Sequence, residues 1–157
     1  MAEHRIVDIA LDDRTVVRRS PEVEHELNVA IYDILETNVF EPVGRYKGPY
    51  HLYLSIEDRR RLVFQLSDTK GKEQGRILLP LVPFRRIVRD YFQICESYYD
   101  AIKRLSPSQI ETLDMARRSI HDEGSALLTE RLEGKARVDP ETARRLFTLI
   151  CVLHIRA

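Results

Sequence analysis

One long amphipathic segment, residues 83–105, constrains the fold of this chain more than any other. Its apolar side chains recur every three or four positions, which is the spacing of one helix face: Phe84, Ile87, Val88, Tyr91, Phe92, Cys95, Tyr98, Ile102 and Leu105. The pattern predicts a helix that packs against a core. The core residues expected from this helix are Phe84, Ile87, Val88, Tyr91, Phe92 and Ile102.

The first turns of this predicted helix carry three arginines, Arg85, Arg86 and Arg89. The N-terminal end of a helix is already partly positive, so each cation there is unfavourable by roughly 0.3–1 kcal/mol. Something should compensate, and the favoured source is the acidic N-terminal third of the chain: Glu22, Glu24 or Glu26. The alternative is an anionic ligand. In that case the predicted anion pocket consists of Arg85, Arg86, Arg89, Arg117 and His121.

The N-terminal half alternates between strand and helix patterns. Residues 5–11 alternate apolar and polar side chains and predict a strand, after which residues 12–14 look like a turn and residues 15–18 like a returning strand. Ser20 and Pro21 then form a helix start, with Ser as the N-cap. This helix should end near residue 38, before Pro42 and Gly44.

The middle of the chain predicts an antiparallel meander of three strands. The expected strands are residues 50–56, 61–66 and 76–82, with a polar loop at 68–75. Pro80 has no N–H to donate, so the third strand should lie at a sheet edge or end near this residue.

The last third is predicted to be helical. Ser106 and Gln109 form a capping box that starts a second long helix, which Gly134 ends. Gly124 either interrupts this helix or allows another element to approach closely. The final helix, residues 139–154, is apolar nearly all round, so it is either central in the core or buried in a homodimer. A homodimer through this helix is the expectation.

These elements predict a single domain over residues 1–157 with an α+β fold. A small antiparallel sheet should pack against about four helices, with the β-rich part in residues 1–82 and a helical layer in residues 83–157. The length and the 43% hydrophobic content are enough for a real core.

Charge argues against a strong electrostatic hold on nucleic acid or membrane. The 25 basic and 25 acidic residues give a net charge of zero. The run Arg59–Arg61 could contact phosphates, but a charged turn that protects a sheet edge is favoured, so nucleic-acid binding is the weakest function class. The N-terminus lacks a secretory pattern and the two cysteines sit in apolar helical patterns, so we expect a cytoplasmic protein with two buried thiols.

Catalytic motifs are absent from the sequence. It has no glycine-rich phosphate loop, no GxSxG, no HExxH and no CxxC, so no catalytic residue, cofactor or metal site is predicted. Glu22 and His25 are one Glu-x-x-His pair without a second, and a solvated helix face is favoured. His121 could act as an acid or base, but a boundary histidine with structural hydrogen bonds is favoured. Tyr98 and Tyr99 are expected to find structural partners.

Several runs of the chain resemble the bacterial family catalogued as Uncharacterised Protein Family 0262: RSPEVEHELNVAIYDILE, GPYHLYLSIE, FRRIVRDYFQICESYYDAIKRL, PSQIETLDMARRSIHDEGS and ARRLFTLICVLH. The resemblance covers about residues 5–154. It implies a small, stand-alone bacterial protein and carries no activity, ligand or catalytic residue over to this chain.

Two main functions follow as hypotheses. The leading one is a non-enzymatic interaction or regulatory protein with an unknown protein partner. The second is an enzyme or binder of a small anionic ligand that uses the Arg/His pocket named above.

Overall fold

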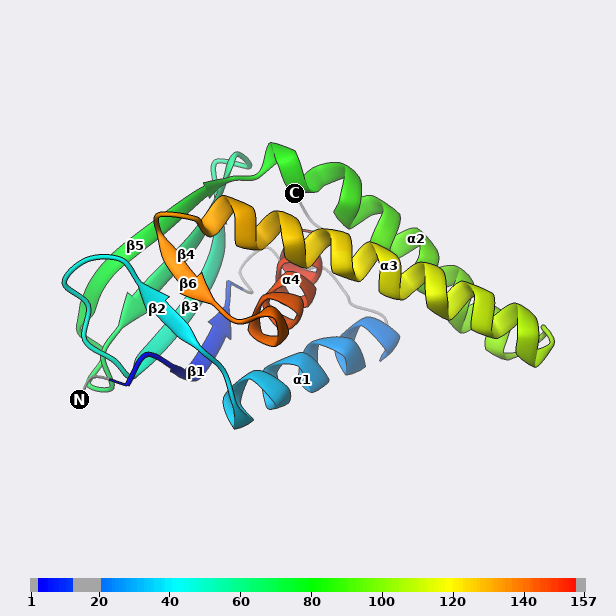
Figure 1. The fold of residues 1–157 in the computed structure, drawn as a ribbon, viewed down its shortest axis with the longest axis horizontal. Helices are drawn as coiled ribbons and strands as arrows, with labels where there is room; N and C mark the ends of the chain where they lie inside the picture. Colours follow the sequence, from blue (N-terminus) through cyan, green and yellow to red (C-terminus); the bar gives the residue numbers. More distant parts are fainter. Residues whose placement is uncertain (1–2, 13–20, 155–157) are drawn as a thin grey trace.

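The computed structural model of the protein describes residues 3–12 and 21–154. Figure 1 shows a sheet at one end and helices beside and beyond it. The predicted turn at 12–14, the returning strand at 15–18 and the Ser20 cap lie outside the described residues, apart from Asp12. The predicted α+β class is confirmed.

The main sheet has four strands in the order β1-β3-β4-β5. Its strands are β1 (Ile6–Leu11), β3 (Tyr50–Glu57), β4 (Arg61–Ser67) and β5 (Glu73–Pro80). The meander β3–β4–β5 is antiparallel as predicted, but β1 pairs with β3 in parallel, so the sheet is mixed rather than antiparallel. A parallel neighbour requires a crossover, and the chain between β1 and β3 contains a helix for this purpose.

A second, two-stranded sheet was not apparent from the sequence. It pairs β2 (Phe40–Pro42) with β6 (Ala136–Val138) in antiparallel fashion. Strands of three residues are too short to leave an alternation pattern.

The third meander strand is longer than predicted. It begins at Glu73 instead of 76, because Glu73 and Gly75 pair with Ser67 and Leu66 of β4. Gly75 also lies against the ring of Tyr46, where a Cβ would overlap the phenol. The strand ends at Pro80 on the sheet edge, in agreement with the missing N–H of proline.

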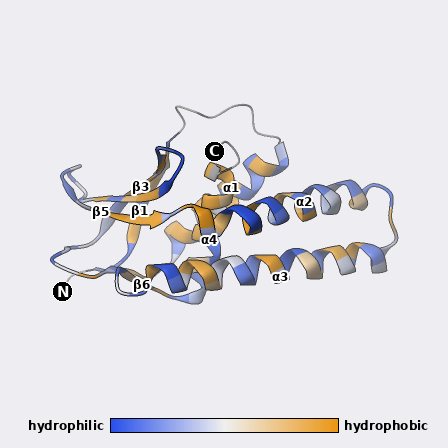
Figure 2. Ribbon diagram, turned by 90° about the horizontal axis from the view of Figure 1, so that it is seen from above, coloured by the Kyte–Doolittle hydropathy of each residue, from blue (hydrophilic) through white to orange (hydrophobic). Residues whose placement is uncertain are grey.

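The four helices are α1 (Pro21–Glu36), α2 (Arg85–Ile102), α3 (Pro107–Leu132) and α4 (Pro140–His154), with a short 3-10 turn, Val82–Phe84, before α2. The capping box of Ser106 and Gln109 forms at the start of α3 as predicted. Helices α2 and α3 run side by side as a hairpin, and its far end projects beyond the rest of the molecule (Figures 1 and 2).

Helix α4 lies in the centre of the helical layer, between α1 and α3 (Figure 1). Its apolar side chains are buried within the single chain: Leu146, Phe147, Leu149, Ile150, Val152 and Leu153. The all-round apolar pattern therefore reflects a central helix. The uncovered face that motivated the homodimer prediction is absent from the described part of this helix.

The apolar stripe of α2 is buried only in its first half. Phe84, Ile87, Val88 and Tyr91 are almost fully buried and Phe92 is half-buried, but Ile102 is 50% exposed. The prediction of Ile102 as a core residue is wrong, because the end of α2 lies in the projecting hairpin, where it packs chiefly against α3.

Candidate functional site

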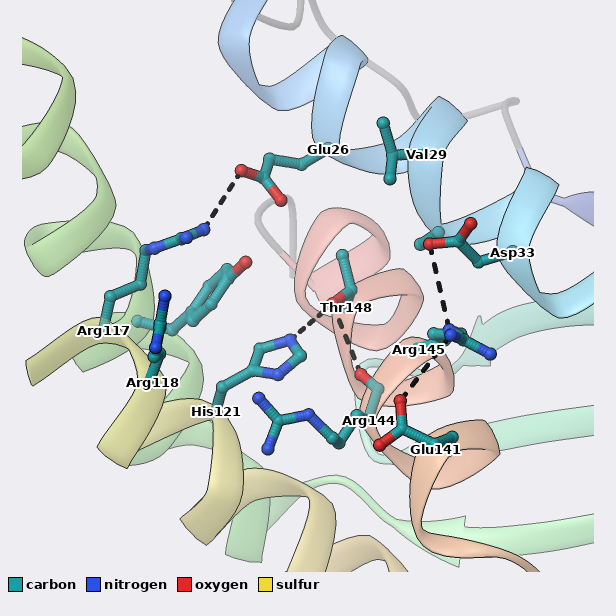
Figure 3. A pocket seen from close by; sticks show the side chains of 12 residues that line it. Glu26, Val29, Asp33, Arg117, Arg118, His121, Glu141, Arg144, Arg145 and Thr148 are labelled. Carbon is teal, nitrogen blue, oxygen red and sulfur yellow. Dashed lines mark hydrogen bonds and ion pairs between the residues drawn. The ribbon is translucent and has the colours of Figure 1, made fainter. Parts of the chain in front are cut away.

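A cavity of about 290 Å³ opens where all four helices meet (Figure 3). Its polar lining comes from α1, α2, α3 and α4 in turn: Glu26 and Asp33; Tyr91; Arg117, Arg118 and His121; Glu141, Arg144, Arg145 and Thr148. Concave sites with a few convergent polar groups are where small ligands bind in most proteins.

The sequence of α4 explains how polar groups come to line this central helix. Glu141, Arg144, Arg145 and Thr148 recur at intervals of three or four residues in an otherwise apolar segment. That spacing gathers them along one side of the helix, which faces the cavity.

His121 forms the floor of the cavity together with Thr148. The two atoms Nε2 of His121 and Oγ1 of Thr148 are 2.6 Å apart, and the Thr148 hydroxyl also donates to the carbonyl of Arg144 at 3.3 Å. A hydroxyl that donates to this carbonyl accepts from the imidazole N–H. The ring of His121 also packs on Tyr91 and Phe147, with centroids 5.5 and 5.7 Å away.

Burial keeps this imidazole neutral at neutral pH. Desolvation is the largest cause, and the positive charges of Arg144 and Arg117 add to it, so the pKa of His121 falls to about 4. The boundary histidine favoured from the sequence is therefore what the structure contains.

Arg117 is held at one side of the cavity by two carboxylates. It donates to Glu26 at 3.3 Å and to Asp114 at 3.0 Å, and its guanidinium lies 5.1 Å from the centre of the Tyr98 ring. Glu26 also accepts a 2.5 Å hydrogen bond from the Tyr99 hydroxyl. The predicted structural partner of the Tyr99 hydroxyl is thus confirmed, whereas the contacts of Tyr98 are made by its ring, with Arg117 and Tyr99.

Arg145 is less tightly held than Arg117. Its guanidinium approaches Asp33 at 3.9 Å and Glu141 at 3.6 Å, distances of ion pairs that exceed those of hydrogen bonds (Figure 3). Its side chain is 25% exposed. A guanidinium whose ion pairs are this long has N–H groups that can donate hydrogen bonds to the oxygens of a bound carboxylate or phosphate. Arginine binds both groups in bidentate fashion.

The structure separates the five residues of the predicted anion pocket. Arg117 and His121 line the four-helix cavity, whereas Arg85, Arg86 and Arg89 do not. Arg85 donates to the carbonyl of Arg59 at 2.9 Å, and Arg86 pairs with Asp90 and Glu123 at 3.0 and 2.9 Å. Arg89 is exposed.

The carboxylates that pair with the arginines at the start of α2 also differ from the predicted ones. The partners of Arg86 come from α2 and α3, not from Glu22, Glu24 or Glu26 in α1, and Glu26 instead pairs with Arg117. Asp90 lies one turn further along the same helix and Glu123 lies on the adjacent helix α3, so both are within reach of Arg86.

Among the pocket residues that were missed from the sequence are Arg144, Arg145 and Thr148 of α4. The available signal was their spacing within the apolar segment 140–154, where polar residues one turn apart mark one side of the helix. The helix was interpreted from its apolar majority, so its polar side was not predicted.

Of the other sequence candidates, Arg59, Arg60 and Arg61 line a surface hollow together with Asp58. The turn before Arg61 places Asp58 and Arg59 in the left-handed region, with φ of 56° and 57°, and Arg61 pairs with Glu57 and Asp58 at 3.2 Å. Cys95 and Cys151 are free, buried thiols as predicted. Within residues 3–12 and 21–154, no three His, Cys, Asp or Glu side chains are grouped to hold a metal, and no helix has the length and apolarity needed to cross a membrane.

Comparison with known proteins identifies relatives along nearly the whole chain. A relative from Rhizobium meliloti is 58% identical over 152 residues, covering 97% of this chain and 95% of its own length. One from Rhodospirillum rubrum is 56% identical over 151 residues, covering 96% and 92%. Both carry the name of the same family of proteins. No solved structure matches the chain. The model of the family described as Uncharacterised protein family (UPF0262) matches residues 3–156, so this chain belongs to that bacterial family.

Proposed function

We propose that the protein is a cytoplasmic, non-enzymatic binder of a small molecule that carries a carboxylate or phosphate group, held in the four-helix cavity. The observation that carries this proposal is Arg145. It lines the cavity with its nearest carboxylate oxygens at 3.6 and 3.9 Å, too far for hydrogen bonds. Arg117 and Arg144 line the same cavity and are paired with carboxylates, Arg117 with Glu26 and Asp114 and Arg144 with Asp122.

The titratable groups around the cavity support binding over catalysis. A general acid or base works best with a pKa near the working pH, and His121 is displaced to about 4. Burial raises the pKa of the nearby Cys95 thiol to about 11 and raises the pKa of Tyr91, so neither is activated as a nucleophile or base. These groups are uncharged at neutral pH and suit a binding surface.

Inorganic phosphate tests the proposal when it is titrated at constant ionic strength, with chloride as the balancing anion. We expect phosphate to raise the melting temperature of the wild type, because a ligand of the folded state stabilises it by mass action. The rise should be lost in Arg145→Gln and kept in the double variant Arg85→Gln, Arg86→Gln, whose side chains lie outside the cavity. Equal rises in all three proteins would contradict the proposal, and so would a rise lost only in the double variant.

A protein-interaction role is the second candidate, and the projecting hairpin favours it. Ile102 at the end of α2, Leu105 between the two helices and Met115 in α3 are 50%, 42% and 64% exposed. Exposed large apolar side chains on one hairpin are candidates for a docking surface. Light scattering measures whether the chain associates with itself through these side chains. A mass that falls in the triple variant Ile102→Ser, Leu105→Ser, Met115→Ser would support this role. A monomer mass in both the wild type and the variant would leave the hairpin without a role in self-association.

The homodimer through the last helix stays a prediction that the same measurement tests. Because the apolar faces of α4 are covered by other parts of the chain, a dimer formed there would have to displace them. A dimer mass unaffected by the hairpin substitutions would favour it.

A further inference from the structure

A second cavity of about 440 Å³ adjoins the four-helix cavity. It lies between α1, α2 and α4, and its apolar walls are Val23, Phe92, Cys95, Tyr99 and Val152. The two cavities share three lining residues, Glu26, Tyr91 and Thr148, so they are neighbours across these side chains.

The two cavities differ sharply in chemistry. Four arginines and three carboxylates, Glu26, Asp33 and Glu141, line the first cavity. The second cavity has no arginine in the part of the chain that the structure describes, and its cation is Lys103. Four carboxylates stand beside the apolar walls of the second cavity: the shared Glu26 together with Glu22, Glu96 and Asp100. An anionic group is therefore favoured in the first cavity and an apolar group in the second.

The shared boundary does not carry an uncompensated charge. Glu26 is the charged residue there, and its carboxylate accepts hydrogen bonds from both Tyr99 and Arg117. Tyr91 is buried and uncharged, and the Thr148 hydroxyl is bonded to His121. An apolar chain that passes these groups meets rings and satisfied polar atoms instead of a bare carboxylate.

From this arrangement we propose that the ligand is an amphiphile, whose anionic head binds beside Arg145 and whose alkyl or aromatic tail occupies the second cavity. This inference rests on the proposed function. The proposed function concerns the anionic head of the ligand, and this inference concerns its tail. A cavity of this size is in the range that takes drug-sized ligands. The walls of Phe92, Tyr99 and Val152 are suited to methylene groups.

A series of straight-chain carboxylates tests the inference in the wild type by isothermal titration calorimetry. Acetate, butyrate, hexanoate and octanoate share one head and differ only in tail length. We expect the dissociation constant to fall by up to about fourfold for each added methylene that is buried. Hexanol, which has the tail without the anion, should bind at least tenfold more weakly than hexanoate. A dissociation constant independent of chain length, or hexanol binding as tightly as hexanoate, would overturn the inference.

Two variants locate the tail and the head. Val23 is half-buried and lines only the second cavity of the pair, so Val23→Phe should remove the chain-length dependence and leave acetate binding unchanged. The matched control Val43→Phe, at a residue that is 62% exposed and away from both cavities, should behave as the wild type. Arg145→Gln should weaken every member of the series.

The outcomes separate the two proposals. Carboxylates that bind through Arg145 without any effect of tail length would leave the proposed function intact and remove the amphiphile. No binding by any carboxylate or phosphate, or binding unaffected by Arg145→Gln, would remove the proposed function itself. Chain-length dependence that survives Val23→Phe would place the tail elsewhere and overturn the inference.

Discussion

Gly124 of α3 lies directly against the ring of Phe147 in α4. A Cβ at position 124 would overlap three carbon atoms of that ring, and Phe147 is fully buried. The glycine therefore allows the two helices to approach closely without interrupting α3, which continues to Leu132. This close approach brings His121 of α3 within hydrogen-bond distance of Thr148 in α4.

Gly124→Ala should destabilise the protein despite the better helix propensity of alanine. The propensity gain is about 1 kcal/mol, whereas overpacking a core costs about 1–3 kcal/mol, and the Cβ would overlap the fully buried Phe147 ring. We expect a net loss in the free energy of unfolding, measured by urea denaturation. Ser119→Ala, at an exposed position of the same helix, is the control and should change stability by less than about 0.5 kcal/mol. A variant at 124 as stable as the wild type would show that the helices can separate.

The two ends of the α2 stripe should respond differently to truncation. Phe84→Ala removes a fully buried ring and should cost about 3–5 kcal/mol of unfolding free energy. Ile102→Ala, at a half-exposed side chain of the hairpin, should cost less than about 1.5 kcal/mol. Denaturant melts of the two variants check this, and equal losses would mean that the far end of α2 is packed as tightly as its start.

Stability should depend on the protonation of His121. Its folded-state pKa of about 4 lies below the ordinary value of 6.5, so the unfolded chain binds the proton more tightly than the folded one. This contribution is fully present above pH 6.5 and is lost as the pH falls through about 4. Its upper limit is about 3 kcal/mol, since each pKa unit corresponds to about 1.4 kcal/mol.

Urea melts between pH 7 and pH 4 measure this contribution, with His121→Gln as the comparison. The difference in unfolding free energy between wild type and variant should shrink as the pH falls. A constant difference across this range would mean that the imidazole titrates normally in the folded protein.

Most of the helices and strands were predicted from local patterns, because each pattern depends only on residues close together in the sequence. The stripe of α2, the capping box at Ser106 and the alternation of β3 and β4 are such patterns. The parallel pairing of β1 with β3 was not predictable in this way, since it depends on where a distant strand docks. The exposure of Ile102 likewise depends on how far the hairpin extends past the body, which helix periodicity does not encode.

The site was predicted only in part for the same reason. Arg117 and His121 were identified on one helix, but Arg145 and Thr148 join them from α4, and no pattern in sequence links the two segments. The arginines at the head of α2 were predicted to need an anionic partner because they oppose the helix dipole. In the folded chain Arg85 and Arg86 instead have partners of their own, a backbone carbonyl and two carboxylates.

Backbone amide chemical shifts during a phosphate titration test the central claim most directly, because they report the place of binding as well as its occurrence. We expect saturable shifts at Arg145, Thr148 and His121, the residues that line the four-helix cavity. Amides of Arg85, Arg86 and Arg89 should stay within the small, linear drift caused by added salt. Saturable shifts confined to the head of α2, or no saturable shifts at all, would contradict the assignment of this cavity as an anion-binding site.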